Sequence, residues 1–341
     1  MQLQHRLALA PMTRNRAQPD GTPGPLAAEY YTQRASLGLL ITEGVQPSED
    51  GQGYMNTPGI FTDAHRDGWR EVADSVHAAG GHLVLQLMHA GRVSHPDNTP
   101  HHRQAIAPSA VSTGGQIPTP SGMQDAPVPR EMTTEDIASV IADFRHAATT
   151  AIAAGADAVE LHGANTYLLH QFLSPSSNQR TDEYGGSVEN RSRFVVEVAT
   201  AVAEEIGADR VGIRISPGLT MGGIDEQGTT GEQYRDLVAR LTPLGLAYLH
   251  VLQQDDEDLL RDIRAAWPTA LLVLRTSRTR ETLTQDLDAG LADVVPLGRW
   301  ALANPDIVER LRTGAELNEA DRTSFYGGGA AGYTDYPTLV G

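Results

Sequence analysis

Short apolar segments alternate with helical patterns along the whole chain, and this alternation limits the fold more than any single motif. We predict strands over 6–11, 37–44, 82–89, 157–163, 210–216, 246–252, 270–276 and 292–298. We predict helices over 25–34, 63–79, 133–154, 187–205, 229–241, 255–266, 279–289 and 305–312. Most of the strands are nearly continuous apolar runs, which is typical of strands covered on both faces. The pattern therefore predicts an α/β fold, a parallel (β/α)8 TIM barrel.

A doubly wound parallel sheet is the main alternative fold. That fold commonly carries a G-x-G-x-x-G turn after its first strand, whereas this chain continues Ala10-Pro11-Met12-Thr13. We find no internal repeat and no second core, so we expect one domain over residues 1–341. Residues 91–130, after the third strand, are rich in proline, glycine, serine and histidine. A loop of this length is expected to cap a functional site.

Composition excludes several classes of function. All 26 cationic residues are arginine and there are 43 acidic residues, so the net charge is −17 and general nucleic-acid binding is not expected. The lack of lysine excludes a Schiff base and a Walker-type lysine. The lack of cysteine excludes thiolate chemistry and disulfides. Because no apolar stretch reaches about 18 residues, we expect a cytoplasmic protein without a membrane segment.

The position of polar residues at predicted strand ends gives a first list of candidate site residues, because TIM barrels place their working groups there. These residues are Thr13, Gly44, Gln86, His89, His162, Arg214, His250 and Arg299. TIM barrels also bind phosphate in the loops after strands 7 and 8, where Gly298 and Arg299 lie beside a predicted helix start at 304–305. An ion pair between Arg299 and a carboxylate such as Asp306 is an equally good interpretation.

The densest polar cluster directly follows the fourth strand. His162 and Asn165 lie three residues apart and could donate two hydrogen bonds to one developing oxyanion. Tyr167 follows, and its phenol could act as a proton donor. The alternative is a buried histidine bonded to a backbone carbonyl, with the tyrosine packed under the loop.

A metal site is a further possibility at the same end of the barrel. The candidate ligands are His89, Glu160, His162, His170, Asp182 and His250. Their spacing argues against a metal, because the first strand has no H-x-H pair and the chain has no lysine to be carbamylated. We therefore expect no metal.

The motifs APMTR, LQLMHAGRVSHP, the long segment from His162 to Phe194, IRISP, LGRWALANPD and GYTDYP occur in this order. Together they resemble the Old Yellow Enzyme family of FMN-dependent ene reductases, over nearly the whole sequence. The resemblance implies a set of FMN-binding residues: Pro11, Met12, Thr13, Gly44, Gln86, Arg214, Ser277, Gly298 and Arg299. It implies a substrate pocket lined by Tyr54, Met88, His162, Asn165, Phe325 and Tyr326. Tyr167 matches the family's proton donor.

The chain departs from the family pattern in three places. Met88 stands where the family usually carries tryptophan, Thr276 and Ser277 replace a glycine-containing turn after the seventh strand, and Pro296 has no backbone amide. The first departure predicts a more adaptable substrate pocket. The other two affect the expected phosphate site.

The resemblance implies an NADPH- or NADH-dependent flavin oxidoreductase. It would reduce the activated C=C bond of α,β-unsaturated carbonyl, imide or nitro compounds by a ping-pong mechanism. The partners expected are small activated alkenes and NAD(P)H, and the chain is expected to be a monomer or a small homo-oligomer. The alternatives are a redox-neutral flavin-dependent isomerase or biosynthetic relative of the same fold, and a flavin-binding relative with a weakened cofactor site.

Overall fold

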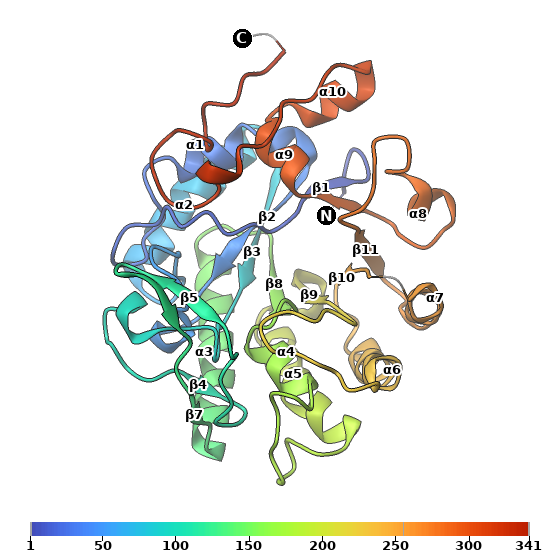
Figure 1. The fold of residues 1–341 in the computed structure, drawn as a ribbon. Coiled ribbons are helices and arrows are strands. Elements are labelled where there is room, and N and C mark those ends of the chain that lie inside the picture. Colours follow the sequence, from blue (N-terminus) through green and yellow to red (C-terminus); the bar gives the residue numbers. More distant parts are fainter. Residues whose placement is uncertain (1, 255, 340–341) are drawn as a thin grey trace.

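Eight parallel strands form a barrel in the computed structural model, which describes residues 2–254 and 256–339 (Figure 1). The strands are β1 (Leu7–Leu9), β2 (Leu39–Val45), β3 (His82–Leu87), β8 (Ala158–Gly163), β9 (Val211–Ile215), β10 (Tyr248–Leu252), β11 (Ala270–Leu274) and β12 (Val295–Leu297). Their order is β11-β10-β9-β8-β3-β2-β1-β12, and a parallel bridge between Leu272 and Val294 brings β11 next to β12. The predicted barrel is therefore confirmed, and a doubly wound sheet is excluded.

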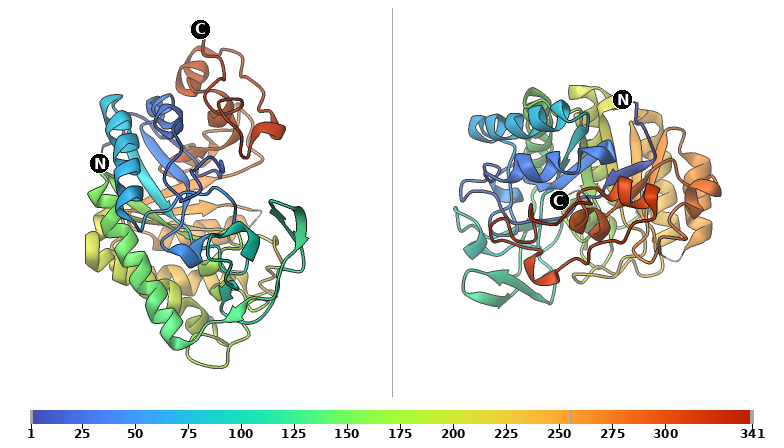
Figure 2. Two further views of the ribbon diagram at one scale, coloured as in Figure 1. Left: turned by 90° about the vertical axis from the view of Figure 1, so that its left-hand side faces the viewer. Right: turned by 90° about the horizontal axis from the view of Figure 1, so that it is seen from above.

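Helices alternate with the strands and cover the outside of the barrel (Figure 2). They are α1 (Ala27–Thr32), α2 (Asp63–Ala78), α3 (Thr134–Ala153), α5 (Val188–Ile206), α6 (Thr230–Leu241), α7 (Glu257–Ala266), α8 (Gln285–Asp288) and α10 (Ile307–Thr313). Two short helices were not predicted, α4 (Leu168–Leu173) and α9 (Arg299–Ala303). The helix predicted over 255–266 corresponds to α7, but its predicted first residue, Asp255, lies outside the described residues. No helix in the described part of the chain is long and apolar enough to cross a membrane.

Two helix predictions were wrong in extent. The helix predicted over 279–289 is reduced to α8, because the Thr282 hydroxyl accepts a hydrogen bond from the Thr279 amide at 2.9 Å and donates to its carbonyl. Such local bonds compete with helical ones. The helix predicted from 305 begins only at Ile307, and α9 already starts at Arg299.

The segment over 91–130 is more ordered than a loop prediction implies. It contains β4 (Ile106–Ala107), which pairs with β7 (Arg130–Glu131), and a hairpin of β5 (Gln116–Thr119) and β6 (Gly122–Asp125). The hairpin projects from the body of the barrel (Figure 2). The side-chain amide of Asn98 ties the hairpin to the loop after β2, because it donates to the carbonyls of Gly53 and Pro118.

The barrel interior changes from apolar to polar along its axis. One end is filled by Ala8, Leu39, Ile41, Val84, Ala158, Tyr248, Leu272 and Val294. Side chains alternate along a strand, so the next inward positions are Gln86, Glu160, Arg214 and His250, all buried. A buried polar layer therefore lies between the apolar floor and the C-terminal ends of the strands.

Gly212 on β9 makes room for the Tyr248 ring inside this apolar floor. A Cβ atom at position 212 would overlap the ring. We predict that Gly212→Ala lowers the free energy of unfolding by about 1–3 kcal/mol, because overpacking a rigid core forces side chains off their rotamers. Urea unfolding measures the loss. Gly115→Ala is the control, since its nearest neighbour would be 3.9 Å away, and an equal loss in both variants would contradict the packing argument.

Candidate active site

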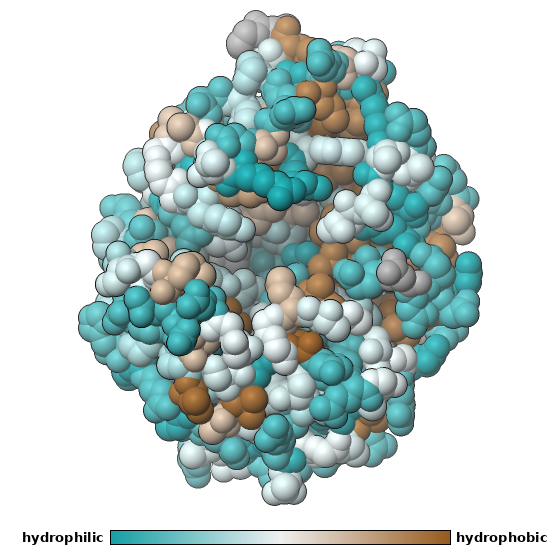
Figure 3. Space-filling view, in the orientation of Figure 1, coloured by the Kyte–Doolittle hydropathy of each residue, from teal (hydrophilic) through white to brown (hydrophobic). Residues whose placement is uncertain are grey.

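A pocket opens at the C-terminal ends of the strands. It is lined by Pro11, Met12, Thr13, Gly44, Gln86, Met88, His162, Asn165, Tyr167, Arg214 and Met221. All of these except Met221 are residues that the sequence predicted for the site. The space-filling view shows that this face of the molecule is hollowed near its centre, with both hydrophilic and hydrophobic residues around the hollow (Figure 3).

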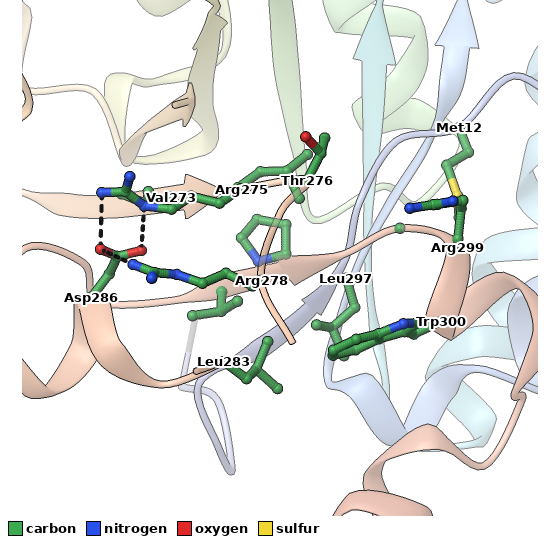
Figure 4. Close-up of a pocket in the computed structure, with 14 residues that line it drawn as sticks. Met12, Val273, Arg275, Thr276, Arg278, Leu283, Asp286, Leu297, Arg299 and Trp300 are labelled. Atoms are coloured by element: carbon green, nitrogen blue, oxygen red, sulfur yellow. Dashed lines mark hydrogen bonds and ion pairs between the residues drawn. The ribbon is translucent and has the colours of Figure 1, made fainter. Parts of the chain in front are cut away.

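Two further cavities adjoin this central pocket. The outer cavity is lined by Thr13, Asn15, Tyr54, Met55, Asn56, Pro118, Tyr167, Tyr326 and Gly327. The lateral cavity is lined by residues that include Met12, Arg275, Thr276, Arg278, Asp286, Pro296, Gly298, Arg299 and Trp300 (Figure 4). Thr13 and Tyr167 belong to both the central and the outer cavity, and Met12 to both the central and the lateral one. The three cavities together suit a long ligand with a second, smaller molecule beside it.

Gly44 reaches the pocket because β2 contains an irregularity. Ile41 pairs with Val84, so a regular ladder would pair Glu43 with Gln86. Gly44 pairs with Gln86 instead, which means that β2 has one extra residue here. The extra residue turns the glycine inward. A Cβ atom here would overlap the sulfur of Met88. The Thr42 hydroxyl accepts a hydrogen bond from the backbone amide of Gln86 at 3.1 Å and so stabilises the irregular pairing.

The polar layer under the pocket is organised around Glu160. Gln86 Nε2 donates to one carboxylate oxygen at 2.7 Å, and His250 Nδ1 lies 2.9 Å from the other. Burial alone favours the neutral acid, but His250, Arg214 and the hydrogen bonds outweigh it, so the pKa of Glu160 lies below its ordinary value. The layer therefore holds a carboxylate beneath the cationic Arg214.

The candidate metal ligands do not gather. Glu160 pairs with His250, while His170 lies 3.3 Å from Glu226 in a separate cluster. Over residues 2–254 and 256–339, no group of three histidine or acidic side chains is placed to hold a metal ion.

The turn after β8 is strained and held by buried hydrogen bonds. Asn165 and Thr166 have φ of 54° and 72°, in the left-handed region that a β-branched residue rarely adopts. The Asn165 amide donates to Ser216 Oγ at 3.0 Å, and the Thr166 amide donates to His170 Nδ1 at 3.1 Å. Gln171 Nε2 donates to the Thr166 carbonyl at 2.7 Å. These bonds fix the turn that carries Asn165 into the pocket beside His162.

Several polar atoms in the pocket are ready to bind a ligand. His162 Nδ1, Asn165 Oδ1 and Arg214 Nε are buried and have no hydrogen-bond partner within the described residues. Satisfied polar groups are the rule in protein interiors, so such atoms mark a binding site. Among the described residues no carbonyl bonds to His162 Nδ1, so the alternative of a histidine bonded to a backbone carbonyl finds no support at this atom.

The protonation states suit hydrogen-bond donation. Burial, with the charge of Arg214, lowers the pKa of His162 well below its ordinary value, so the ring is neutral at pH 7. Burial, with Tyr54 beside it, raises the pKa of Tyr167 well above its ordinary value, so the phenol keeps its proton. Its hydroxyl lies 3.4 Å from that of Tyr54, and the two rings meet edge to face.

Arg299 faces the lateral cavity without a partner. Its side chain makes no hydrogen bond or ion pair with the described part of the chain. Asp306, the carboxylate considered for it, pairs instead with Arg310 at 2.6 Å. The ion-pair interpretation of Arg299 with Asp306 was therefore wrong, and its guanidinium is available to an anionic ligand.

Two predicted residues lie outside the cavity walls. Ser277 is exposed and does not line the three cavities. Phe325 is half-buried and packs edge-on against Tyr326, which is 67% exposed and lines the outer cavity. The sequence also missed Met221 and the residues Asn15, Met55, Asn56 and Pro118. Met221 follows the fifth strand, so the strand-end rule could have included it.

Comparison with known proteins agrees with this architecture. Residues 1–318 match the NADH:flavin oxidoreductase / NADH oxidase family. A probable flavin mononucleotide-dependent alkene reductase of Leishmania infantum is 41% identical, over 99% of this chain and 94% of the relative. The 12-oxophytodienoate reductase 7 of Oryza sativa subsp. japonica is 40% identical, over 99% and 92%. Morphinone reductase in complex with tetrahydroNAD superposes with a TM-score of 0.95 and 43% identity, over 99% and 95%.

The barrel and its pocket thus define an FMN-dependent oxidoreductase. The chain belongs to the NADH:flavin oxidoreductase / NADH oxidase family, which is the Old Yellow Enzyme family. The expected FMN-dependent alkene reductase and the use of FMN with NAD(P)H are confirmed at the level of the family.

We predict a flat pH profile for alkene reduction between about pH 7 and about pH 9. A histidine with a lowered pKa becomes protonated only at lower pH, and a tyrosine with a raised pKa loses its proton only at higher pH. Stopped-flow measurement of flavin reoxidation by 2-cyclohexenone gives the rate of that half-reaction at each pH. An inflection inside this interval that disappears in Tyr167→Phe would contradict the assigned protonation state of the tyrosine.

Proposed function

We propose that this chain reduces the activated C=C bond of α,β-unsaturated carbonyl, imide or nitro compounds with NAD(P)H, by a ping-pong mechanism in one shared pocket. The observation that carries the proposal is the convergence of His162, Asn165 and Tyr167 above Arg214. These groups bring unpartnered buried polar atoms and a protonated phenol into one pocket. The proposal also gives residues 91–130 the role of capping the outer cavity, which Pro118 lines.

The cavity system fits FMN. Pro11, Met12 and Thr13 form one wall of the central pocket, and the amide of Gln86 and the guanidinium of Arg214 lie on the same pocket. Arg214 Nε lacks a partner within the described residues, so a ligand oxygen or nitrogen can satisfy it. Bound FMN supplies the hydride. Gly298 and Arg299 line the lateral cavity, where the phosphate would be held.

His162 and Asn165 bind the carbonyl or nitro oxygen of the alkene. A neutral imidazole and a carboxamide each offer an N–H to one oxygen, and buried hydrogen bonds already hold the turn that carries Asn165, so little reorganisation is needed as negative charge develops. The same pair binds the carboxamide of the nicotinamide in the first half-reaction. One pocket therefore receives the two molecules in turn, which accounts for ping-pong kinetics.

Tyr167 donates a proton to the α-carbon. Its raised pKa keeps the proton on the phenol in the resting site, and Tyr54 holds the hydroxyl in place. The substrate body extends into the outer cavity, along Tyr54 and Tyr326. Met88 forms a flexible part of the inner wall, which suits substrates of varied shape.

Anaerobic titration tests the reaction class. We predict that NADPH or NADH bleaches the visible absorbance of the purified protein and that 2-cyclohexenone restores it with one equivalent. Counting nicotinamide oxidised per product distinguishes a reductase from a redox-neutral isomerase. Bleaching without recovery on addition of enone would contradict the assigned substrate class, and product formed without nicotinamide consumption would indicate the isomerase.

The role of Tyr167 is tested by Tyr167→Phe, compared with Tyr54→Phe, which removes the partner of the Tyr167 hydroxyl but keeps the hydroxyl itself. We predict that Tyr167→Phe slows reoxidation by the enone about 10²-fold or more, because it removes the proton donor. Reduction by NAD(P)H should change little, since that half-reaction needs no proton from the tyrosine. Tyr54→Phe should slow the enone step much less than Tyr167→Phe, and a large loss confined to Tyr54→Phe would assign the proton to Tyr54 instead.

A further inference from the structure

The lateral cavity has few groups that could neutralise a phosphate. A phosphate monoester carries about −1.5 to −2 charges at neutral pH, and Arg299 supplies one free positive charge. Pro296, on the same wall, has no backbone N–H to offer. A second cation is therefore needed if a phosphate is to be held here tightly.

The opposite wall carries two arginines on one carboxylate. Figure 4 shows Arg275 and Arg278 converging on Asp286, with Arg299 and Met12 on the other side of the cavity. Arg275 Nε and Nη2 lie 2.9 Å and 3.1 Å from the two Asp286 oxygens. Arg275 also pairs with Glu257, so it bridges both acids, and Asp286 keeps two hydrogen bonds from Arg275 whether or not Arg278 stays.

Arg278 is the less firmly held of the two. Its contact with Asp286 is a single one, Nη2 to Oδ1 at 2.8 Å, and Gln285 accepts from Nη1. Its Nε is buried and has no hydrogen-bond partner within the described residues. The Arg278 side chain is 21% exposed, whereas that of Arg275 is 9% exposed. Because Arg275 stays on Asp286, Arg278 can leave without stranding a buried carboxylate.

We propose that Arg278 turns from Asp286 to the phosphate of FMN and acts with Arg299 as a two-arginine clamp. The inference rests on the proposed use of this cavity by FMN and adds a cofactor-binding residue to it. A guanidinium can donate two parallel N–H bonds to a phosphate, so the Arg278 side chain can supply donors in place of the amide that Pro296 lacks. No covalent bond is made or broken when Arg278 exchanges one ion pair for the other.

Binding of two flavins to the apoprotein tests the clamp, because riboflavin lacks the phosphate. Quenching of flavin fluorescence gives both dissociation constants. We predict that Arg278→Gln weakens FMN binding about 10- to 100-fold and leaves riboflavin binding unchanged, as expected for loss of one charge-assisted hydrogen bond. Arg261→Gln, which removes an exposed partner of Asp258, is the control and should change neither constant.

Asp286→Asn is the second variant, and the clamp predicts the opposite sign for it. With its competing carboxylate neutralised, Arg278 should bind phosphate more readily, so the ratio of riboflavin to FMN dissociation constants should rise. Equal changes for both flavins in these two variants, or none, would overturn the clamp and leave Arg278 a structural residue. A wild-type apoprotein that binds neither flavin would instead contradict the proposed function, so the two failures are distinguishable.

Discussion

The site depends on a carboxylate buried inside the barrel. Glu160 joins β3 to β10 through hydrogen bonds to Gln86 and His250, and its charge balances that of Arg214. An unpaired charge at this depth would be costly, so each member of the layer requires the others. The strand register decides which residues face this polar layer. A shift of β8 by one residue would turn Glu160 toward the helices and remove the counter-charge from the pocket floor.

The strained turn above this layer depends on a second buried network. Asn165 and Thr166 adopt left-handed conformations that cost about 1–3 kcal/mol each. Hydrogen bonds to Ser216 and His170 compensate for this strain. His170 in turn lies against Glu226, and Glu226 accepts from the Gly218 amide at 3.0 Å. The loop after β9, which carries Met221, is thereby tied to the turn that positions Asn165.

Strand and helix patterns in the sequence predicted the barrel, because buried parallel strands leave continuous apolar runs that few other elements produce. The strand-end rule and the family motifs gave the central pocket, since the pleat fixes which residues face it. Contacts made by long-range packing were not predictable in this way. Pro118 reaches the outer cavity through a hairpin anchored by Asn98. Ser277 is exposed in a turn whose neighbours Arg275 and Arg278 bond to Asp286 on α8. The partners of Arg275 and Arg278 likewise lie on separate elements.

The two ends of the cavity system therefore place different demands on the chain. At the central pocket, the proposed substrate presents one oxygen, so the hydrogen bonds of His162 and Asn165 must point at one place, and strand register and buried partners fix both residues. At the lateral cavity the proposed ligand is the phosphate of FMN, and its charge can be met by any cation that reaches it. Arg299 begins α9, whereas Arg278 comes from a turn without regular structure. On this proposal, a sequence can replace the residues of the turn after β11 and still bind phosphate, while the turn after β8 tolerates little change.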